Sequence, residues 1–285
     1  MGRRSQVVRQ RSAKPSSAGS IPAVASTIST PAGFNFTATV ESHGWYHLAP
    51  FRWERPVLWR KERVGNRTVD VEITHRDGAL HLSHPLPLDR VNRMFQLNVD
   101  VAEFVTLTRD SPAHAWVEEA GFGRLLCGAT VWEDAVKIVC TTNTTWRQTK
   151  RMVELLVAKC GRGGAFPSQA DVARFSEEEL KEDCRLGYRA KSIVALAKAE
   201  IQEGVDFKTY LKLPGIGPYG AAHLLAMDGQ HDFIAVDTEF RRFVRERYHG
   251  GRKVSDETML RRYAKWGRWK YLAYWAEIHH YFYKG

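Results

Sequence analysis

Apolar and polar residues alternate in the first third of the chain. Residues 67–74 read Arg-Thr-Val-Asp-Val-Glu-Ile-Thr, with an apolar side chain at every second position of the central part. This period is typical of a strand with one buried face. Asp77-Gly78 follows, a dipeptide that favours a two-residue turn, and residues 79–82 return as Ala-Leu-His-Leu. The pattern predicts a hairpin, and we place a small antiparallel β-rich domain at residues 34–105.

From residue 106 onward the spacing of apolar residues changes to three or four, which is typical of helices. Near the end of the chain, Leu272, Trp275, Ile278 and Phe282 follow this spacing. We therefore expect a helical body over residues 106–285. Together with the β-rich segment, this predicts an α+β fold that is mostly helical.

The first 33 residues show neither period and are rich in Ser, Ala, Pro and Arg. We interpret residues 1–33 as a disordered basic tail, whose composition also suits an organellar transit peptide. The net charge of +10 is uneven, because residues 31–240 carry −3 whereas residues 241–285 carry +8. Basic ends on a nearly neutral body are typical of proteins that bind polyanions, although a solvated basic face has the same composition.

Composition excludes several classes of protein. A hydrophobic content of 44% with 9 Trp and 13 Phe excludes disorder of the whole chain. No stretch is apolar enough to predict a membrane span. The four cysteines are Cys127, Cys140, Cys160 and Cys184. Because no two of them form a Cys-x-x-Cys pair, we expect no zinc ribbon, no iron–sulfur cluster and no base deaminase, but reduced thiols of an intracellular protein.

Two segments carry the candidate chemistry. Residues 213–221 read Leu-Pro-Gly-Ile-Gly-Pro-Tyr-Gly-Ala between two helical stretches. Glycines at 215 and 217 favour a sharp turn with positive φ and close backbone approach, and the free amides that begin the second helix can bind a phosphate. Asp237 follows Tyr219 by 18 residues and opens another predicted helix. Taken singly, the first segment is also an ordinary turn between helices, and Asp237 an ordinary N-cap.

Taken together, the two segments closely resemble the helix-hairpin-helix base-excision DNA glycosylases, the superfamily of endonuclease III, 3-methyladenine DNA glycosylase II and 8-oxoguanine DNA glycosylase. In that superfamily the hairpin grips a DNA phosphate, and an aspartate lies downstream in a segment much like Ile234-Ala-Val-Asp-Thr238. The resemblance covers residues 34–285. The β-rich segment suits the branch that contains the 8-oxoguanine and 3-methyladenine enzymes.

The resemblance also implies roles for other residues. Residues 138–147 look like the segment of 8-oxoguanine glycosylases whose asparagine fills the hole left by the flipped base, and Asn143 matches it. Residues 186–191 match a further stretch of that family. The implied DNA contacts are Asn143, Gly215, Gly217, Tyr219, Gly220, Arg241 and Arg242, and the implied base-pocket residues are Tyr219, Trp132 and Trp146. Ordinary structural roles are the alternatives. Asn143 is then a cap, Trp132 a core residue, and Arg241 and Arg242 part of a solvated basic face.

Asp237 is the implied catalytic residue, since a carboxylate stabilises the positive charge that develops on the sugar. We expect the helix N-terminus to lower its pKa and keep it ionised. Bifunctional members use a lysine that forms a Schiff base, and Tyr219 stands at that position. The tyrosine in place of the lysine predicts a monofunctional enzyme. Because Lys212 is close in the sequence, weak lyase activity is not excluded.

These observations predict a monofunctional DNA glycosylase that removes an alkylated or oxidised purine and leaves an abasic site. Two alternatives remain: an enzyme that removes uracil or thymine from mismatches, and a non-catalytic binder of damaged DNA. The implied partner is double-stranded DNA with a damaged base, bound by a monomer in the cytoplasm, the nucleus or an organelle. No cofactor is required, beyond a monovalent cation that the hairpin carbonyls are able to hold.

Overall fold

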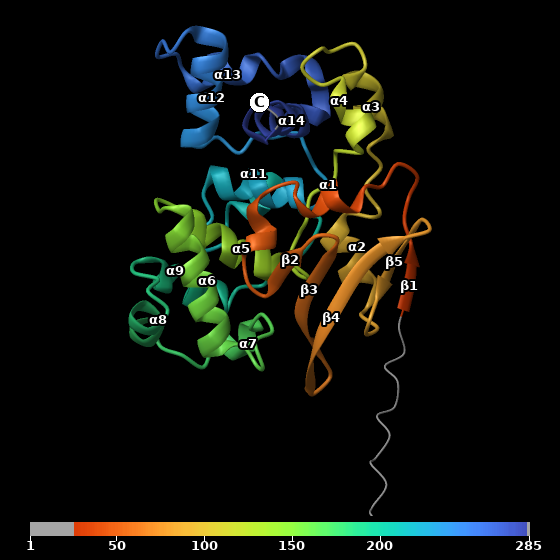
Figure 1. The fold of residues 1–285 in the computed structure, drawn as a ribbon. Coiled ribbons are helices and arrows are strands. Elements are labelled where there is room, and N and C mark those ends of the chain that lie inside the picture. The colour runs from red at the N-terminus through yellow and green to blue at the C-terminus, as the bar shows by residue number, and fades with distance from the viewer. Residues whose placement is uncertain (1–25, 284–285) are drawn as a thin grey trace, which may run out of the picture.

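The computed structural model describes residues 26–283, which combine one five-stranded sheet with a helical body (Figure 1). The strands are β1 (Ser26–Ser29), β2 (Phe51–Glu54), β3 (Val57–Val64), β4 (Arg67–Arg76) and β5 (Ala79–Leu82). Their order is β1-β5-β4-β3-β2, and every neighbouring pair is antiparallel. The predicted α+β fold is confirmed.

The predicted hairpin is β4 and β5, in which Arg76 faces Ala79. Asp77 and Gly78 between them both have positive φ, 52° and 70°, as a two-residue turn requires. Strand β1 lies inside the segment that was expected to be a disordered tail, and its Ile28 faces Leu80 of β5. Four residues are too few to show a period, and only the neighbouring strand makes them extended. The rest of the predicted tail, residues 1–25, lies outside the described residues.

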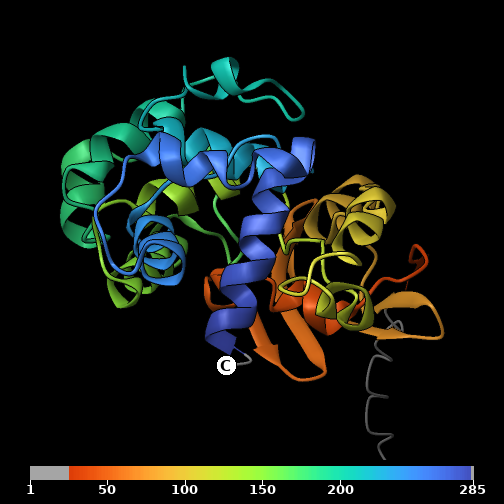
Figure 2. The same cartoon turned by 90° about the horizontal axis from the view of Figure 1, so that it is seen from above.

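The helices and 3₁₀ turns follow in chain order as α1 (Phe36–Val40), η1 (Gly44–His47), α2 (Leu88–Phe95), α3 (Ala102–Thr108), α4 (Trp116–Ala120), α5 (Val131–Thr141), α6 (Trp146–Cys160), α7 (Gln169–Val172), α8 (Glu177–Asp183), α9 (Arg189–Leu196), α10 (Phe207–Tyr210), α11 (Pro218–Met227), α12 (Thr238–His249), α13 (Asp256–Arg261), η2 (Ala264–Trp269) and α14 (Lys270–Tyr283). Figure 2 shows the long helix α14 passing between the helical body and the sheet side of the molecule. Its Leu272 and Ile278 are buried, as the spacing of apolar residues near the end of the chain predicted.

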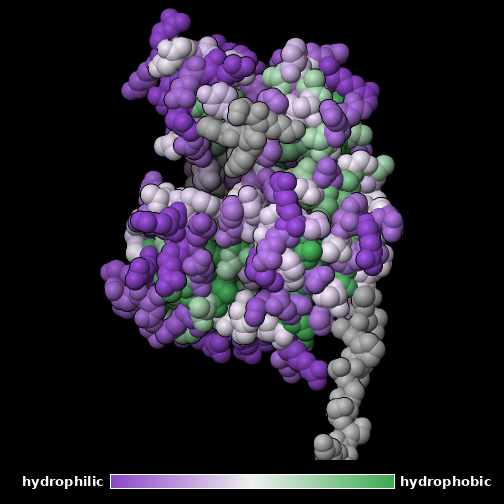
Figure 3. Space-filling model, in the orientation of Figure 1, coloured by the Kyte–Doolittle hydropathy of each residue, from purple (hydrophilic) through white to green (hydrophobic). Residues whose placement is uncertain are grey.

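Helix α5 is the central element of the body, because its residues from Val131 to Cys140 are all buried. It packs against α6, α9 and α11. One continuous apolar core runs from the strands into these helices, so Leu80 and Ile138 belong to the same cluster. Over the face seen in Figure 3, hydrophilic residues cover most of α8 and of α12–α13, and the outline is notched between these regions at the level of α11. Within residues 26–283, every helix is too short or too polar to cross a membrane.

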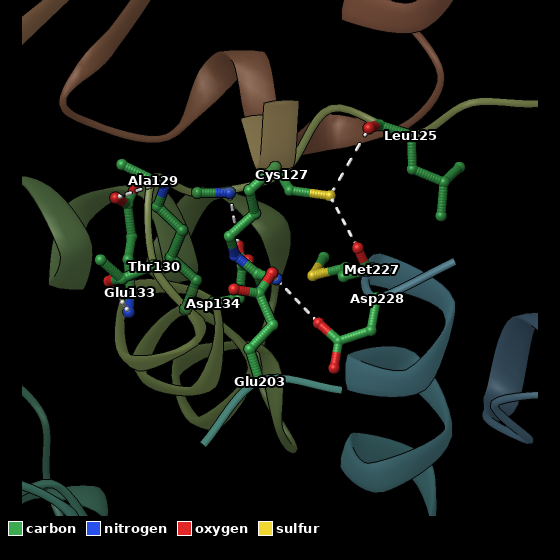
Figure 4. A network of polar contacts seen from close by, with 12 residues as sticks. Leu125, Cys127, Ala129, Thr130, Glu133, Asp134, Glu203, Met227 and Asp228 are labelled. Atoms are coloured by element: carbon green, nitrogen blue, oxygen red, sulfur yellow. Dashed lines mark hydrogen bonds and ion pairs between the residues drawn. The ribbon is translucent and has the colours of Figure 1, made fainter. Parts of the chain in front are cut away.

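An ionic network centred on the buried Arg93 joins α2 to α5, to the end of α11 and to the loop that carries Glu203. Arg93 of α2 donates to Asp134 of α5 at 2.7 Å, to Asp228 after α11 at 2.7 Å and to Glu203 at 2.5 Å. Figure 4 shows the three carboxylates converging from separate segments. The side chains of Arg93, Asp134 and Asp228 are at most 4% exposed. A buried charge is costly unless it is paired, so each segment is held in place by the other two.

We expect Arg93→Ala to lower the free energy of unfolding by about 3–5 kcal/mol, because it leaves two buried carboxylates without their cation. Arg109→Ala is the matched control, since the Arg109–Glu118 pair is 58% and 49% exposed. Its loss is expected to cost less than about 1 kcal/mol. Urea unfolding followed by circular dichroism measures both. Equal losses in the two variants would contradict the network's role.

Candidate functional site

The glycine-rich segment forms a hairpin between α10 and α11. Gly215 has φ +78°, and a Cβ there would lie 2.6 Å from Ser192 Cβ. Only glycine fits this position. Gly217 differs, because its φ is −92° and an added Cβ would meet no atom within 4 Å. The expectation that both glycines need positive φ is right for Gly215 and wrong for Gly217.

Helix α11 begins without a side-chain cap. Gly217 is its N-cap, and Pro218 occupies the first helical position. The amide of Ala221 donates to the Gly217 carbonyl at 2.9 Å, the first hydrogen bond of the helix. The amides of Tyr219 and Gly220 come before Ala221 in the helix, so they have no acceptor within it. They are free to donate to an acceptor outside the helix. The Gly217 oxygen keeps a second lone pair, the kind of ligand a monovalent cation takes, and the expected cation stays a prediction.

Asp237 is the N-cap of α12, and its Oδ1 accepts the Phe240 amide at 2.7 Å. Its side chain is half-buried. Burial raises its pKa above the ordinary value, although the backbone amides of Phe240 and Glu239 act in the opposite direction. The expectation of a lowered pKa is therefore wrong, because removal from water outweighs the helix N-terminus. The result is a carboxylate with increased basicity.

Tyr219 and Asp237 are neighbours in the fold. The negative charge of Asp237 and the burial of Tyr219 raise the pKa of the phenol to about 12, burial being the larger cause. The side chain of Thr141, the last residue of α5, lies close enough to the Tyr219 hydroxyl to act on its pKa in the opposite direction. Thus the hairpin, the aspartate and the end of α5 meet at one place.

Sequence reasoning missed a cluster of rings beside Tyr219, which we call the aromatic cluster: His43, Trp45, Tyr219, His223, Tyr271 and Trp275. His223 lies one helical turn after Tyr219, and their ring centroids are 5.8 Å apart. Trp45 of η1 stacks on His223 at 5.3 Å, and Tyr271 of α14 lies 6.1 Å from it. The cluster joins three segments far apart in the chain. Only the helical spacing of His223 from Tyr219 was a usable signal for it.

Asn143 lies in the loop between α5 and α6. It is exposed and has φ +47°. Its Nδ2 donates to the Tyr188 hydroxyl at 3.3 Å, and its carbonyl accepts from the buried Arg189 at 3.2 Å. Tyr188 itself is 62% exposed. The structure thus presents an amide and a phenol side by side, with Arg189 fixing the backbone beneath them. Tyr188 was not predicted as a site residue, although its segment had been noted.

The two candidate tryptophans lie in different surroundings. Trp132 is 6% exposed, and its indole donates to the Pro167 carbonyl at 2.8 Å. It precedes Thr141 by nine residues of α5, which is about 13 Å along the helix. The structure therefore corrects its assignment from the pocket to the core. Trp146 is half-exposed and packs against Gly44, so close that a Cβ on Gly44 would lie 2.6 Å from its ring.

Arg241 and Arg242 both hold carboxylates at the surface. Arg241 pairs with Asp256 at 2.7 Å, and Arg242 pairs with Glu239 at 2.6 Å. All four side chains are at least one third exposed, so these pairs are weak and a phosphate is able to replace the carboxylate. In the described part of the chain, no group of three or more His, Cys, Asp or Glu is arranged to hold a metal ion, and all four cysteines are free and buried.

Comparison with known proteins gives a family-model match over part of the chain and a fold. Residues 136–268 match the family model described as HhH-GPD superfamily base excision DNA repair protein. No curated protein sequence matches the chain.

Solved structures cover nearly the whole chain. One is the 3-methyladenine DNA-glycosylase from Archaeoglobus fulgidus, with TM-score 0.72, 18% identity and coverage of 90% of this chain and 99% of that chain. Another is the 8-oxoguanine glycosylase/lyase of Clostridium acetobutylicum in its apo form, with TM-score 0.71, 16% identity and coverage of 90% and 95%. A third is MBOgg1 in complex with a low affinity DNA ligand, with TM-score 0.69, 20% identity and coverage of 89% and 96%. At these identities the likeness establishes the fold.

The two hairpin glycines make a matched pair for mutation. We expect Gly215→Ala to lower the free energy of unfolding by about 2 kcal/mol or more, because the new Cβ is strained at positive φ and collides with Ser192. Gly217→Ala meets no neighbour, and we expect a change below about 0.5 kcal/mol. Thermal and urea unfolding of both variants measure the difference. A loss of the same size at Gly217 would show that the hairpin geometry differs from the one described.

Proposed function

Residues 136–268 form a domain of the HhH-GPD superfamily of base excision DNA repair proteins, and on this premise we propose that the protein is a monofunctional DNA glycosylase. It binds DNA, takes a damaged purine out of the stack and hydrolyses its N-glycosidic bond. The observation that carries the proposal is the placement of the half-buried Asp237 beside Tyr219, where the hairpin opens α11. This gives one site with phosphate-binding amides and a carboxylate.

Asp237 performs the chemistry in this proposal. As the bond between C1′ and the base nitrogen breaks, its electrons leave with the base and positive charge develops on the sugar. The half-buried carboxylate stabilises that charge. Water then bonds to C1′ and releases a proton. The raised pKa of Asp237 makes its carboxylate a better acceptor for this proton than an exposed one.

Tyr219 supports the monofunctional mode. A phenol forms no Schiff base with the sugar, and its raised pKa keeps it protonated at neutral pH. Lys212 lies before the hairpin with its side chain exposed. The abasic product is therefore left uncut, and the proposed reaction needs only water as co-reactant.

DNA is held around this site by groups of three kinds. The first amides of α11 take a backbone phosphate. Arg241 and Arg242 exchange their surface carboxylates for further phosphates. Asn143 and the exposed Tyr188 fill the space that the extruded base leaves, which offsets the few kcal/mol that unstacking costs. The similar solved structures named for 3-methyladenine and 8-oxoguanine support an alkylated or oxidised purine as the substrate class.

The decisive experiment measures base release from duplexes that carry 3-methyladenine, 7-methylguanine, 8-oxoguanine, hypoxanthine, uracil or a G·T mismatch. We expect strand breaks only after alkali treatment, and no adduct trapped by borohydride. Asp237→Asn is expected to lower the release rate by about 100-fold or more, because it removes the charge that faces the sugar. Its DNA affinity should stay equal or rise.

Asp206→Asn is the matched control for this variant. Asp206 is also an N-cap, and its Oδ1 accepts the Thr209 amide at 2.8 Å, but it is exposed at the start of α10. Asparagine caps helices as well as aspartate does, so both variants should fold. Unchanged release by Asp237→Asn would remove Asp237 from the mechanism. Borohydride-trapped adducts would reveal an amine nucleophile.

The pH profile tests the state of the carboxylate. The ionised form of Asp237 is the active one, so release slows as the pH falls through its pKa. Because burial raises that pKa, the loss begins at a higher pH than the value of about 4 typical of exposed aspartate. Single-turnover rates between about pH 4 and pH 8, with circular dichroism at each pH, measure this limb. A rate that stays flat until the protein unfolds would contradict it.

A further inference from the structure

A buried arginine follows α4 and has few partners. Arg124 is only 6% exposed. Its Nη2 donates to the Val99 carbonyl at 3.0 Å, whereas its Nε is buried and has no acceptor among the described residues. A guanidinium group has five N–H donors, so most of the hydrogen-bonding capacity of Arg124 is unused. Within residues 26–283 it also forms no ion pair with a carboxylate.

The other three buried arginines of the described chain are better satisfied. Arg60 is paired with two buried glutamates, and Arg93 is paired with three carboxylates. Arg189 has no carboxylate, but it donates to two neighbouring backbone carbonyls, and its guanidinium carbon lies 4.7 Å from the centre of the Tyr188 ring. A buried charge is strongly unfavourable without a counter-charge, so Arg124 calls for an explanation.

Asp100 is the acidic residue whose charge acts on Arg124. Its charge raises the pKa of the guanidinium, but burial has the larger effect and lowers that pKa. The Asp100 side chain is exposed, and its Oδ1 accepts the Ala102 amide at 2.9 Å at the start of α3. Asp100 therefore acts from a distance and leaves the guanidinium without a carboxylate in contact.

Arg124 lines a cavity of about 580 Å³. The walls come from the segment between β1 and α1, the segment between α2 and α3, helix α3 and the end of α4. Leu97, Val101, Val105 and Phe122 give these walls an apolar part. The volume is typical of a site for a small molecule. The long helix α14 separates α3 and α4 from α12, the helix that Asp237 caps (Figures 1 and 2).

The charges around the cavity limit what it binds. Besides Arg124 and Asp100, the lining includes Arg109 and Glu118, which pair with each other at 2.6 Å. The four formal charges cancel, so the cavity gives no net attraction for a polyanion such as DNA. A single carboxylate in contact with Arg124 gains charge-assisted hydrogen bonds in a place that is poor in water. The apolar walls favour a carboxylate that is joined to an apolar group.

From the unpaired guanidinium and its cavity we propose that Arg124 binds the carboxylate of a small organic acid, whose apolar part lies against Leu97, Val105 and Phe122. A free monocarboxylic acid and the last residue of a peptide share this chemistry, and the volume of the cavity favours the free acid. None of the residues assigned to the proposed glycosylase lines this cavity. The inference therefore stands or falls independently of that function.

The test measures binding of hexanoate and of hexanamide to the full-length protein at constant ionic strength. The two probes have the same apolar chain and differ in charge. We expect hexanoate to bind at least about 10-fold more tightly in calorimetric titration, because it supplies the missing counter-charge. It should also raise the melting temperature in proportion to the logarithm of its concentration. Equal affinity for both probes, or no binding of hexanoate, would overturn the proposal.

A third probe separates the two sources of the carboxylate. It is a tetrapeptide that ends in leucine, with its C-terminus either free or amidated. We expect the free peptide to bind less tightly than hexanoate, because the cavity has the volume of a small molecule. Tighter binding of the free peptide than of hexanoate, lost on amidation, would overturn the assignment to a small acid.

Arg124→Met is the diagnostic variant. It removes a charge that has no carboxylate partner, so without ligand the melting temperature should stay equal or rise. Its affinity for hexanoate should fall about 10-fold or more, to that for hexanamide. Unchanged affinity for hexanoate in this variant would overturn the role of Arg124. The comparison of the two probes on the wild-type protein needs no variant, so it decides the question even where Arg124→Met fails to fold.

Arg109→Met is the matched control. Arg109 lines the same cavity, but it is 58% exposed and already paired with Glu118. We expect its loss to change the affinity for hexanoate by less than about 2-fold, because exposed ion pairs contribute little. An equal fall in Arg109→Met and Arg124→Met would show a general effect of surface charge and would overturn the proposal.

Discussion

The site depends on one buried carboxylate, Asp134. Its Oδ2 accepts from Arg93 of α2, and its Oδ1 accepts both the Trp45 indole and the Gly128 amide, at 2.7 and 2.8 Å. Through Arg93 it is linked to Asp228 at the end of α11. Because none of these charges can be left unpaired away from water, the turn that carries Trp45 and the helix that carries Tyr219 are fixed relative to each other.

The same competition between burial and polar partners explains the chemistry of the site. Asp237 caps α12 and still has a raised pKa, since the loss of water outweighs two backbone hydrogen bonds. Tyr219 and Tyr271 surround it with groups that stay neutral. A carboxylate held this way accepts a proton more readily than an exposed one, which is the property that the proposed function requires of Asp237.

Local sequence signals identified the parts of the site but not its pocket. The residues around Gly215 predicted the hairpin, and the position of Asp237 predicted the candidate carboxylate. Both predictions were possible because turns and helix caps depend on neighbouring residues in the chain. The turn at Asp77-Gly78 was also predicted from neighbouring residues alone. Trp132 illustrates the limit: helical spacing says that a tryptophan lies on a face, but not which end of the helix meets the site. No local signal places Trp45 against His223.

The sequence alone was enough to predict the α+β class, the hairpin of β4 and β5, the turn at Gly215 and the aspartate that follows it. Each of these depends on residues within a few positions of one another. Only the folded structure shows that Ser26–Ser29 form a strand, that the pKa of Asp237 is raised and that the rings of His43 and Tyr271 each lie next to His223. These properties depend on which distant segments exclude water from a group, and that exclusion exists only once the chain has folded.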